Sequence, residues 1–190
     1  IFPLVEALTE MDKDSEIPAF ELLLAGGCQE EGIARLLSGK PALRAGDAGE
    51  LKALPFRARY LGMLSQTELA AAFSTSDIFV LPSYYEGLPL VLIEAMASGA
   101  IPVCTSLPGI KSWLASKITS DNTVLVEPPE MRAPGEPFES EIPAFKERLK
   151  TGLISALELA HRKRFDPDYV YPNTSNASWD GVTETILKYV

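Results

Sequence analysis

The sequence predicts an α/β fold, a Rossmann-like, doubly wound parallel sheet with helices on both faces. Two observations support this class. Short apolar runs typical of strands alternate with segments of helical periodicity, and the five runs span 20–25, 59–61, 78–81, 101–104 and 123–126. Within each run the apolar residues are nearly continuous, which is typical of strands buried on both faces. Ligands of such sheets bind at the carboxyl ends of the strands.

Helices are expected between and after these strands. The pattern Ser65-Gln66-Thr67-Glu68 is a capping box, which predicts a helix from there to about Phe73. The other expected helical segments are 30–37, 51–54, 89–98, a short stretch around Trp113, 143–164 and 179–190. A proline-rich acidic loop at 127–143 is expected to be a solvated surface segment rather than a metal site. We expect residues 1–190 to form a single domain.

Composition excludes several classes of protein. The 190 residues carry a net charge of −9, which argues against nucleic-acid binding, because such surfaces need clustered Lys and Arg. Cys28 and Cys104 are far apart and lack metal-ligand spacing, so a reducing, cytoplasmic setting is expected rather than a disulfide framework. No run approaches the roughly 20 apolar residues that span a bilayer. The chain opens at Ile1 inside an amphipathic pattern, and we expect it to be part of a longer protein.

The candidate site lies where the strand at 78–81 runs through a short loop into the helix at 89–98. A strand, a loop and a helix N-terminus can hold phosphate groups, because unpaired backbone N–H groups and the helix dipole face the ligand. Pro89 suits the first helical position, since its missing N–H would be unpaired there. Gly87 has no Cβ and would let a ligand approach the backbone closely. The sequence therefore predicts an anion site at this helix start.

Two glutamates flank the predicted anion site. Glu94 is roughly 8 Å from the helix start along the axis, where a carboxylate could hold ribose hydroxyls beside a diphosphate. Glu86 precedes the helix and would face the other end of the ligand. Both could instead be plain surface charges. The residues around Glu94 are nearly all apolar, however, and a helix that is apolar all round is buried, so its carboxylate needs a partner. This favours the binding role.

Other candidate residues have simpler interpretations. His161 ends a helix, where a cation complements the dipole. Cys28 is expected to be a loop residue near the site rather than a reactive thiol. Trp113 and Trp179 are expected to pack rather than to hold sugars, and Asp77 has no assigned catalytic role.

The segment Glu86-Gly87-Leu88-Pro89-Leu90-Val91-Leu92-Ile93-Glu94 resembles the Glu-x7-Glu motif of group 1 (family 4) retaining glycosyltransferases. Those enzymes have the GT-B fold, in which two Rossmann-like domains enclose the active site. The resemblance covers most of 1–128 and 178–190. It is carried further by residues 59–64, 68–69, 76–83, 99–103, 125–129 and 178–179.

The resemblance implies that this chain is the C-terminal, donor-binding half of a GT-B enzyme. Glu94 would hold the donor ribose, and Glu86, the candidate catalytic residue, would hold the donor sugar hydroxyls. The backbone of Gly87, Leu88 and Leu90 would meet the diphosphate and the sugar.

The resemblance also places the nucleotide base against the main chain of Gly62, Met63 and Leu64. Pro89 replaces a glycine found in many members, which removes one possible N–H donor. There is no Asp-x-Asp metal motif, and no metal or other cofactor is expected. The implied partners are a nucleotide-sugar donor, a saccharide or lipid-linked acceptor, and an N-terminal acceptor domain that these residues do not include.

The sequence therefore predicts the donor-binding domain of a hexosyltransferase, which moves a sugar from a nucleoside diphosphate to a hydroxyl in bacterial cell-surface polysaccharide synthesis. An Arg and a Lys that neutralise the diphosphate in this family should precede Ile1, so these residues alone are expected to be inactive. The expected location is cytoplasmic or at the inner face of the membrane, with membrane contact only through the missing half.

Two alternatives stay open. One is a metabolic enzyme that resembles glycogen or sucrose synthase, which an acceptor assay would distinguish. The other is a catalytically inactive nucleotide-binding module, which loss of the expected Arg and Lys would favour. A dinucleotide-dependent dehydrogenase is disfavoured, because no Gly-x-Gly-x-x-Gly turn stands in the required strand context.

Overall fold

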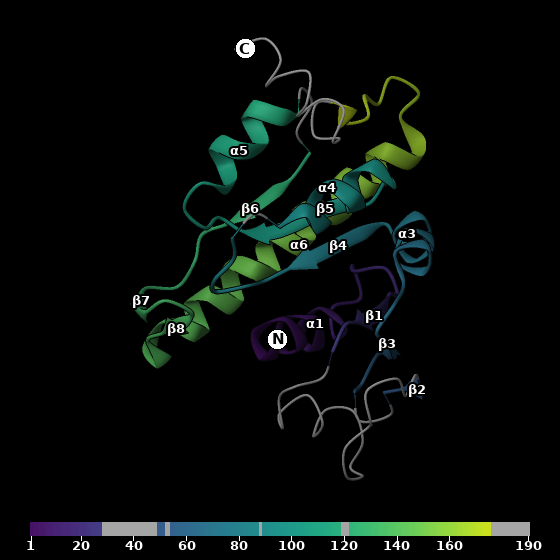
Figure 1. The fold of residues 1–190 in the computed structure, drawn as a ribbon. Helices are drawn as coiled ribbons and strands as arrows, with labels where there is room; N and C mark the ends of the chain where they lie inside the picture. The colour runs from purple at the N-terminus through teal and green to yellow at the C-terminus, as the bar shows by residue number, and fades with distance from the viewer. Residues whose placement is uncertain (28–48, 52–53, 88, 119–121, 176–190) are drawn as a thin grey trace, which may run out of the picture. The chain divides into compact units, whose positions relative to one another are not determined.

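The computed structural model describes residues 1–27, 49–51, 54–87, 89–118 and 122–175 (Figure 1). The chain divides into two compact units, residues 1–69 and 70–190, and each is described by itself. The α/β class is confirmed, because each unit contains parallel strand pairs and helices. The expected helices at 30–37 and 179–190 lie outside the described residues, as do Cys28, Leu88 and Trp179.

The first unit contains a helix and a three-stranded sheet. Helix α1 (Phe2–Met11) buries one apolar side, and β1 (Glu21–Ala25), β2 (Gly49–Glu50) and β3 (Arg57–Gly62) follow. The strand order is β1-β3-β2, with β1 parallel and β2 antiparallel to β3.

One expectation for this sheet was wrong. Strand β3 alternates between buried and exposed side chains, with Arg57 and Arg59 on the exposed side, so it is half-buried rather than covered on both faces. The helical turn expected at 51–54 includes residues 52–53, which lie outside the described part. At its ends, the Leu54 N–H donates to the Leu51 carbonyl over 3.4 Å.

The predicted capping box is confirmed at α3 (Gln66–Ser74). The Ser65 N–H donates to Glu68 Oε2 over 2.8 Å, and the Glu68 N–H donates to Ser65 Oγ over 3.3 Å. The Ser65 hydroxyl also donates to Glu68 Oε2 over 2.7 Å. These hydrogen bonds to the ionised carboxylate hold the pKa of Glu68 below its usual range.

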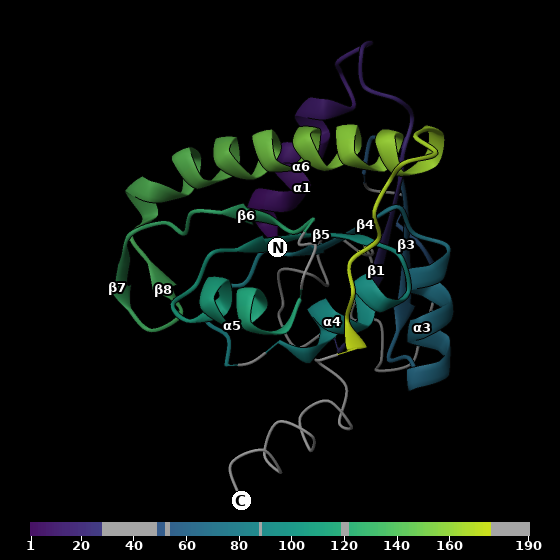
Figure 2. The same cartoon turned by 90° about the horizontal axis from the view of Figure 1, so that it is seen from above.

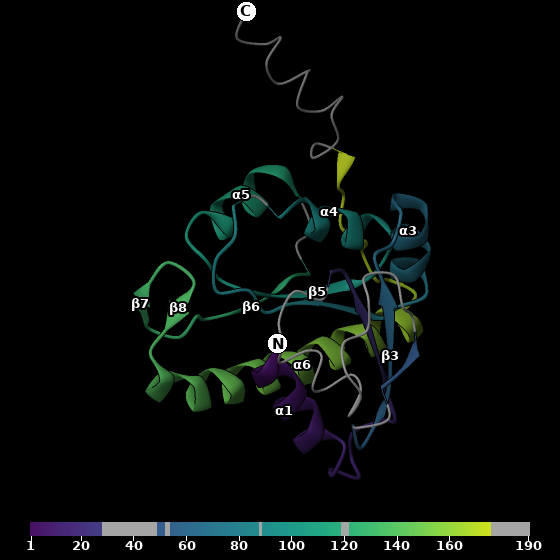
Figure 3. The same cartoon turned by 60° about the horizontal axis from the view of Figure 1, so that its bottom comes forward.

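The second unit is built on an all-parallel sheet in the order β4-β5-β6. Its strands are β4 (Ile78–Leu81), β5 (Ile101–Thr105) and β6 (Val124–Val126). Helices α4 (Leu90–Ala97) and α5 (Ile110–Lys117) cover one face, and α6 (Ile142–Phe165) covers the other (Figures 2 and 3). The central strand β5 is buried along its whole length, as its continuous apolar run predicted.

Both faces of this sheet carry apolar cores. On the α4 and α5 side the buried cluster is Leu92, Met96, Cys104, Leu107, Ile110, Leu114 and Ile118. On the other side α6 buries Phe145, Leu149, Leu153 and Ala156. Gly152 lies where α6 crosses the sheet, and an added Cβ would come within 2.8 Å of Val126 Cγ2 and 3.3 Å of Val124 Cγ1. The absence of a side chain at residue 152 therefore sets how closely α6 approaches β6.

The segment predicted as an irregular loop at 127–143 has regular structure. Strands β7 (Met131–Ala133) and β8 (Glu136–Pro137) form an antiparallel hairpin, followed by the 3-10 turn η1 (Glu139–Glu141). Gly135 supplies the left-handed residue of the turn, with φ +78°. The Phe138 N–H donates to the Glu130 carbonyl over 3.0 Å and closes the hairpin. The strands are too short to give a periodic sequence signal.

Replacing Gly152 with Ala should destabilise the chain by about 1–3 kcal/mol, because the new methyl group overlaps Val126 and Val124. Gly-to-Ala in a helix interior ordinarily stabilises by up to about 1 kcal/mol, so the expected sign is the reverse of the usual one. Chemical denaturation measures the change. Adding Val126→Ala should make the two losses less than additive; a more stable Gly152→Ala variant would contradict the close packing.

The pKa of Glu68 should rise toward its usual range in a Ser65→Ala variant, because the hydroxyl bond to the ionised carboxylate is removed. The lowered pKa means that the cap stabilises the chain above the ordinary glutamate pKa. Its contribution is lost as pH falls through the lower, folded-state value. Carboxyl NMR titration of both proteins measures the shift, and equal titration curves would refute the capping box.

Candidate functional site

The loop after β4 holds the first predicted carboxylate in a defined position. Ser83 Oγ donates to Glu86 Oε1 over 2.6 Å, and the Glu86 side chain is partly buried. The Tyr84 ring contacts the Phe145 ring of α6 edge-on, with centroids 5.6 Å apart. Ser83 and Tyr84 therefore fix the backbone on which Glu86 stands.

The helix start is open, as an anion site requires. Gly87 is exposed, and a Cβ added there would meet nothing within 4 Å. Helix α4 begins at Leu90 rather than at Pro89, which is the buried N-cap and accepts the Leu92 N–H over 3.0 Å. The N–H groups of Leu90 and Val91 are in the first turn, so they have no carbonyl acceptor within the helix. N–H groups in that position point outward from the helix end. Leu88 lies outside the described residues.

The expectation that Glu94 is buried was wrong. Its side chain is exposed, and it shares one exposed stripe of α4 with Leu90, which is 51% exposed, and Ala97. Leu92 and Met96 form the buried side against β4 and β5. The apolar composition of α4 suggested burial all round, but the sheet covers only one of its faces. Burial therefore does not support a binding role for Glu94. Its position, about 6 Å beyond Leu90 along the helix axis, is still suitable for holding a ribose beside a diphosphate at the helix start.

The far end of α4 is fixed by a Schellman motif. Gly99 adopts φ +93°, its N–H donates to the Met96 carbonyl over 3.0 Å, and the Ala100 N–H donates to the Ala95 carbonyl over 2.9 Å. Lys163, in the last turn of α6, donates to the Gly99 carbonyl. These contacts fix the direction in which the N-terminus of α4 points.

The loop predicted to meet the nucleotide base lies at the carboxyl end of β3, next to the Gly26 loop that follows β1. Gly62 has φ +70°, and its carbonyl accepts the Gly26 N–H over 2.8 Å. The Tyr60 hydroxyl donates to the Gly26 carbonyl over 2.6 Å. Met63 is 65% exposed and Leu64 is partly buried. The two hydrogen bonds join the loop after β1 to the loop after its parallel neighbour β3. This group belongs to the first unit, and the Glu86–Glu94 group belongs to the second.

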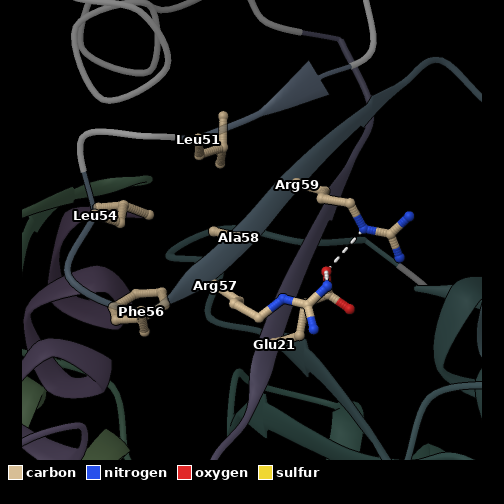
Figure 4. Close-up of a pocket in the computed structure, with 7 residues that line it drawn as sticks. All are labelled: Glu21, Leu51, Leu54, Phe56, Arg57, Ala58 and Arg59. Carbon is tan, nitrogen blue, oxygen red and sulfur yellow. Dashed lines mark hydrogen bonds and ion pairs between the residues drawn. The ribbon is translucent and has the colours of Figure 1, made fainter.

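A pocket of about 170 Å³ lies elsewhere in the first unit (Figure 4). Arg59 Nε donates to Glu21 Oε1 over 2.8 Å at its rim, and Arg57 is 3.8 Å from the same carboxylate oxygen. Glu21 and Arg57 begin their strands, so this pocket is at the amino end of β1 and β3, opposite the Gly26 and Gly62 loops. Exposed ion pairs of this kind contribute about 0–1 kcal/mol. The pocket is therefore not formed by the Gly62 loop, and its lining is Glu21, Leu51, Leu54, Phe56, Arg57, Ala58 and Arg59.

The described residues contain neither a candidate metal site nor a candidate membrane span. Among the residues that the structure places, no three His, Cys, Asp or Glu side chains gather closely enough to hold a metal ion. Within the same part of the chain, no helix has both the length and the apolar character to cross a bilayer.

Sequence reasoning missed three features beside Glu86: its bond from Ser83, the exposed ring of Tyr85, and the β7–β8 hairpin. A serine three residues before Glu86 was a usable local signal for the first. The exposure of Tyr85 depends on packing between distant segments, which no local pattern encodes.

The chain is similar in sequence to known proteins over most of its length. The sequence model of the family described as glycosyl transferases group 1 matches residues 3–134. Proteins named D-inositol 3-phosphate glycosyltransferase from Mycobacterium bovis and Mycobacterium tuberculosis are each 30% identical over 105 residues. The aligned part is 55% of this chain and 21% of each relative, so the chain spans about a fifth of their length.

Proposed function

This chain belongs to the glycosyl transferase group 1 family, and on that premise we propose that it binds the nucleoside diphosphate sugar of a retaining hexosyltransferase. It would form the C-terminal, donor-binding half of a GT-B enzyme. The observation that carries the proposal is the open start of α4, where Gly87 and the amides of Leu90 and Val91 stand beside Glu86 and Glu94.

The proposed chemistry follows from this arrangement. The bond between the anomeric carbon and the diphosphate breaks, and the electron pair leaves with the diphosphate. Developing negative charge there is stabilised by preorganised N–H groups and the helix dipole. The carboxylate of Glu86, oriented by Ser83, would accept hydrogen bonds from the sugar hydroxyls, and Glu94 would accept those of the ribose. The loop at Gly62, Met63 and Leu64 would meet the base.

The acceptor in this proposal is a hydroxyl group on a saccharide or a lipid-linked saccharide. The mycobacterial relatives are named for an inositol phosphate, a polyol, which supports a hydroxyl nucleophile. Bacterial cell-surface polysaccharide synthesis at the cytoplasmic side of the membrane is the proposed setting. No metal or other cofactor is assigned a step.

The prediction that these residues bind a nucleotide without transferring a sugar is part of the proposal. The chain spans about a fifth of the length of its mycobacterial relatives, and in this proposal sugar transfer needs residues beyond these 190. A metabolic glycosyltransferase and a catalytically inactive nucleotide-binding module both remain as alternatives. An acceptor assay on a longer protein would distinguish a metabolic enzyme from the proposed role. The inactive module would be favoured if the Arg and Lys expected before Ile1 were absent.

Glu94→Ala should weaken binding of the matching nucleoside diphosphate by about 1.5–3 kcal/mol, the scale of a hydrogen bond to a charged group. Glu86→Ala should leave the bare diphosphate unaffected and weaken only the nucleotide sugar. Isothermal titration with UDP, GDP, ADP and their glucose or mannose derivatives measures both effects.

Glu158→Ala is the matched control for these variants, because Glu158 is exposed on α6, on the other face of the sheet from α4. It should bind every ligand as the unaltered chain does. Equal diphosphate affinities for Glu94→Ala and Glu86→Ala would show that the two roles are wrongly assigned.

A further inference from the structure

The turn of the β7–β8 hairpin lies close to the loop that carries Glu86. A Cβ added at Gly135, in the hairpin turn, would be 3.6 Å from Tyr85 Cβ, which is ordinary contact distance. Gly135 has no Cβ, so the turn lies near Tyr85, the residue that immediately precedes Glu86, and leaves a small space between them. Figure 1 shows the hairpin where the chain leaves β6, between the sheet and the start of α6.

The hairpin has its own supports. Arg132 Nη2 and Glu136 Oε2 form an ion pair across it, 2.7 Å apart. Arg148 of α6 donates from Nε to the Glu127 carbonyl over 3.1 Å and from Nη2 to the Pro128 carbonyl over 3.0 Å. The chain is therefore bound to α6 just before it enters β7, so the hairpin is held at both its base and its strands.

Two consecutive tyrosines in the loop have opposite environments. Tyr84 packs against Phe145, which is fully buried in the α6 core. Tyr85 is 70% exposed although the turn at Gly135 lies near its Cβ. The nearby turn limits the space on one side of the Tyr85 backbone, while most of the residue stays exposed to a ligand. Single exposed apolar residues are common on protein surfaces; the backing by a braced hairpin distinguishes this one.

The chemistry around Tyr85 matches one face of a pyranose. A pyranose ring presents apolar C–H groups on its face and hydroxyl groups at its rim. An aromatic ring offers an apolar, electron-rich face for the C–H groups, and the neighbouring Glu86 carboxylate accepts hydrogen bonds from hydroxyls. The Ser83 hydroxyl already orients the Glu86 carboxylate through a hydrogen bond of 2.6 Å, and Tyr85 is the next residue to Glu86 in the loop.

We propose that Tyr85, backed by the β7–β8 hairpin, is a stacking platform for the donor sugar and a determinant of which sugar the site accepts. The inference rests on the proposed function, since it deepens the role of the same site. Tyr85 binds the sugar ring and makes no contribution to the bare nucleotide. The hairpin sets the position of the platform.

The test is isothermal titration of the whole chain with a nucleoside diphosphate and with its sugar derivative, using the UDP, GDP and ADP series. Tyr85→Leu should weaken the nucleotide sugar about tenfold and leave the bare diphosphate unchanged. Tyr85→Phe keeps the ring and should restore the affinity for the sugar to within about twofold. Tyr171→Leu, another exposed tyrosine of the same unit, is the matched control and should change neither affinity.

The outcomes separate the platform from the nucleotide site. If Tyr85→Leu weakens both ligands equally, or neither, the platform is refuted while the nucleotide site stands. The same holds if Tyr85→Phe behaves like Tyr85→Leu. Absence of nucleotide binding by the unaltered chain refutes the proposed function itself. Circular dichroism of each variant ensures that the comparison is made between folded proteins.

Discussion

The direction of α4 is the constraint on which the candidate site depends. Its buried side, with Leu92 and Met96, holds it against β4 and β5, and the Schellman motif at Gly99 fixes its C-terminal end. Lys163 ties that end to α6. With these contacts in place, the start of the helix at Leu90 must project from the carboxyl edge of the sheet, where a dipole and unpaired N–H groups favour an anion. Packing alone therefore positions the helix start at which the proposed anion would bind.

The rest of the second unit supports the loop that precedes this helix. Gly152 lets α6 approach β6 closely, and α6 then supplies Phe145, which holds Tyr84. Arg148 of the same helix donates hydrogen bonds to the chain just before the hairpin, and the hairpin turn lies near Tyr85. Helix α6, on the other side of the sheet, thus supports two features next to the Glu86 loop: the ring of Phe145 and the base of the hairpin. The site is shaped as much by this helix as by the motif that identifies the family.

Sequence alone could predict what local chemistry determines. The strand at 78–81 and the Ser65–Glu68 capping box follow from short patterns, and the structure confirms both. The exposure of Glu94 could not be predicted, because helix composition does not say which faces a sheet will cover. The hairpin at Gly135 was missed for another reason: its strands have three and two residues, too few for a periodic signal. The assignment of Glu86 and Glu94 to sugar and ribose stays a prediction.

The central claim is that a nucleoside diphosphate binds at the start of α4, and backbone-amide NMR during titration tests it most directly. With UDP, GDP and ADP as ligands and NAD as the control, one diphosphate should shift the amides of Gly87, Leu90 and Val91. The same ligand should shift the loop at Gly62–Leu64, which is proposed to meet the base. Shifts confined to Gly26 and Gly27, or saturation by NAD alone, would contradict the account.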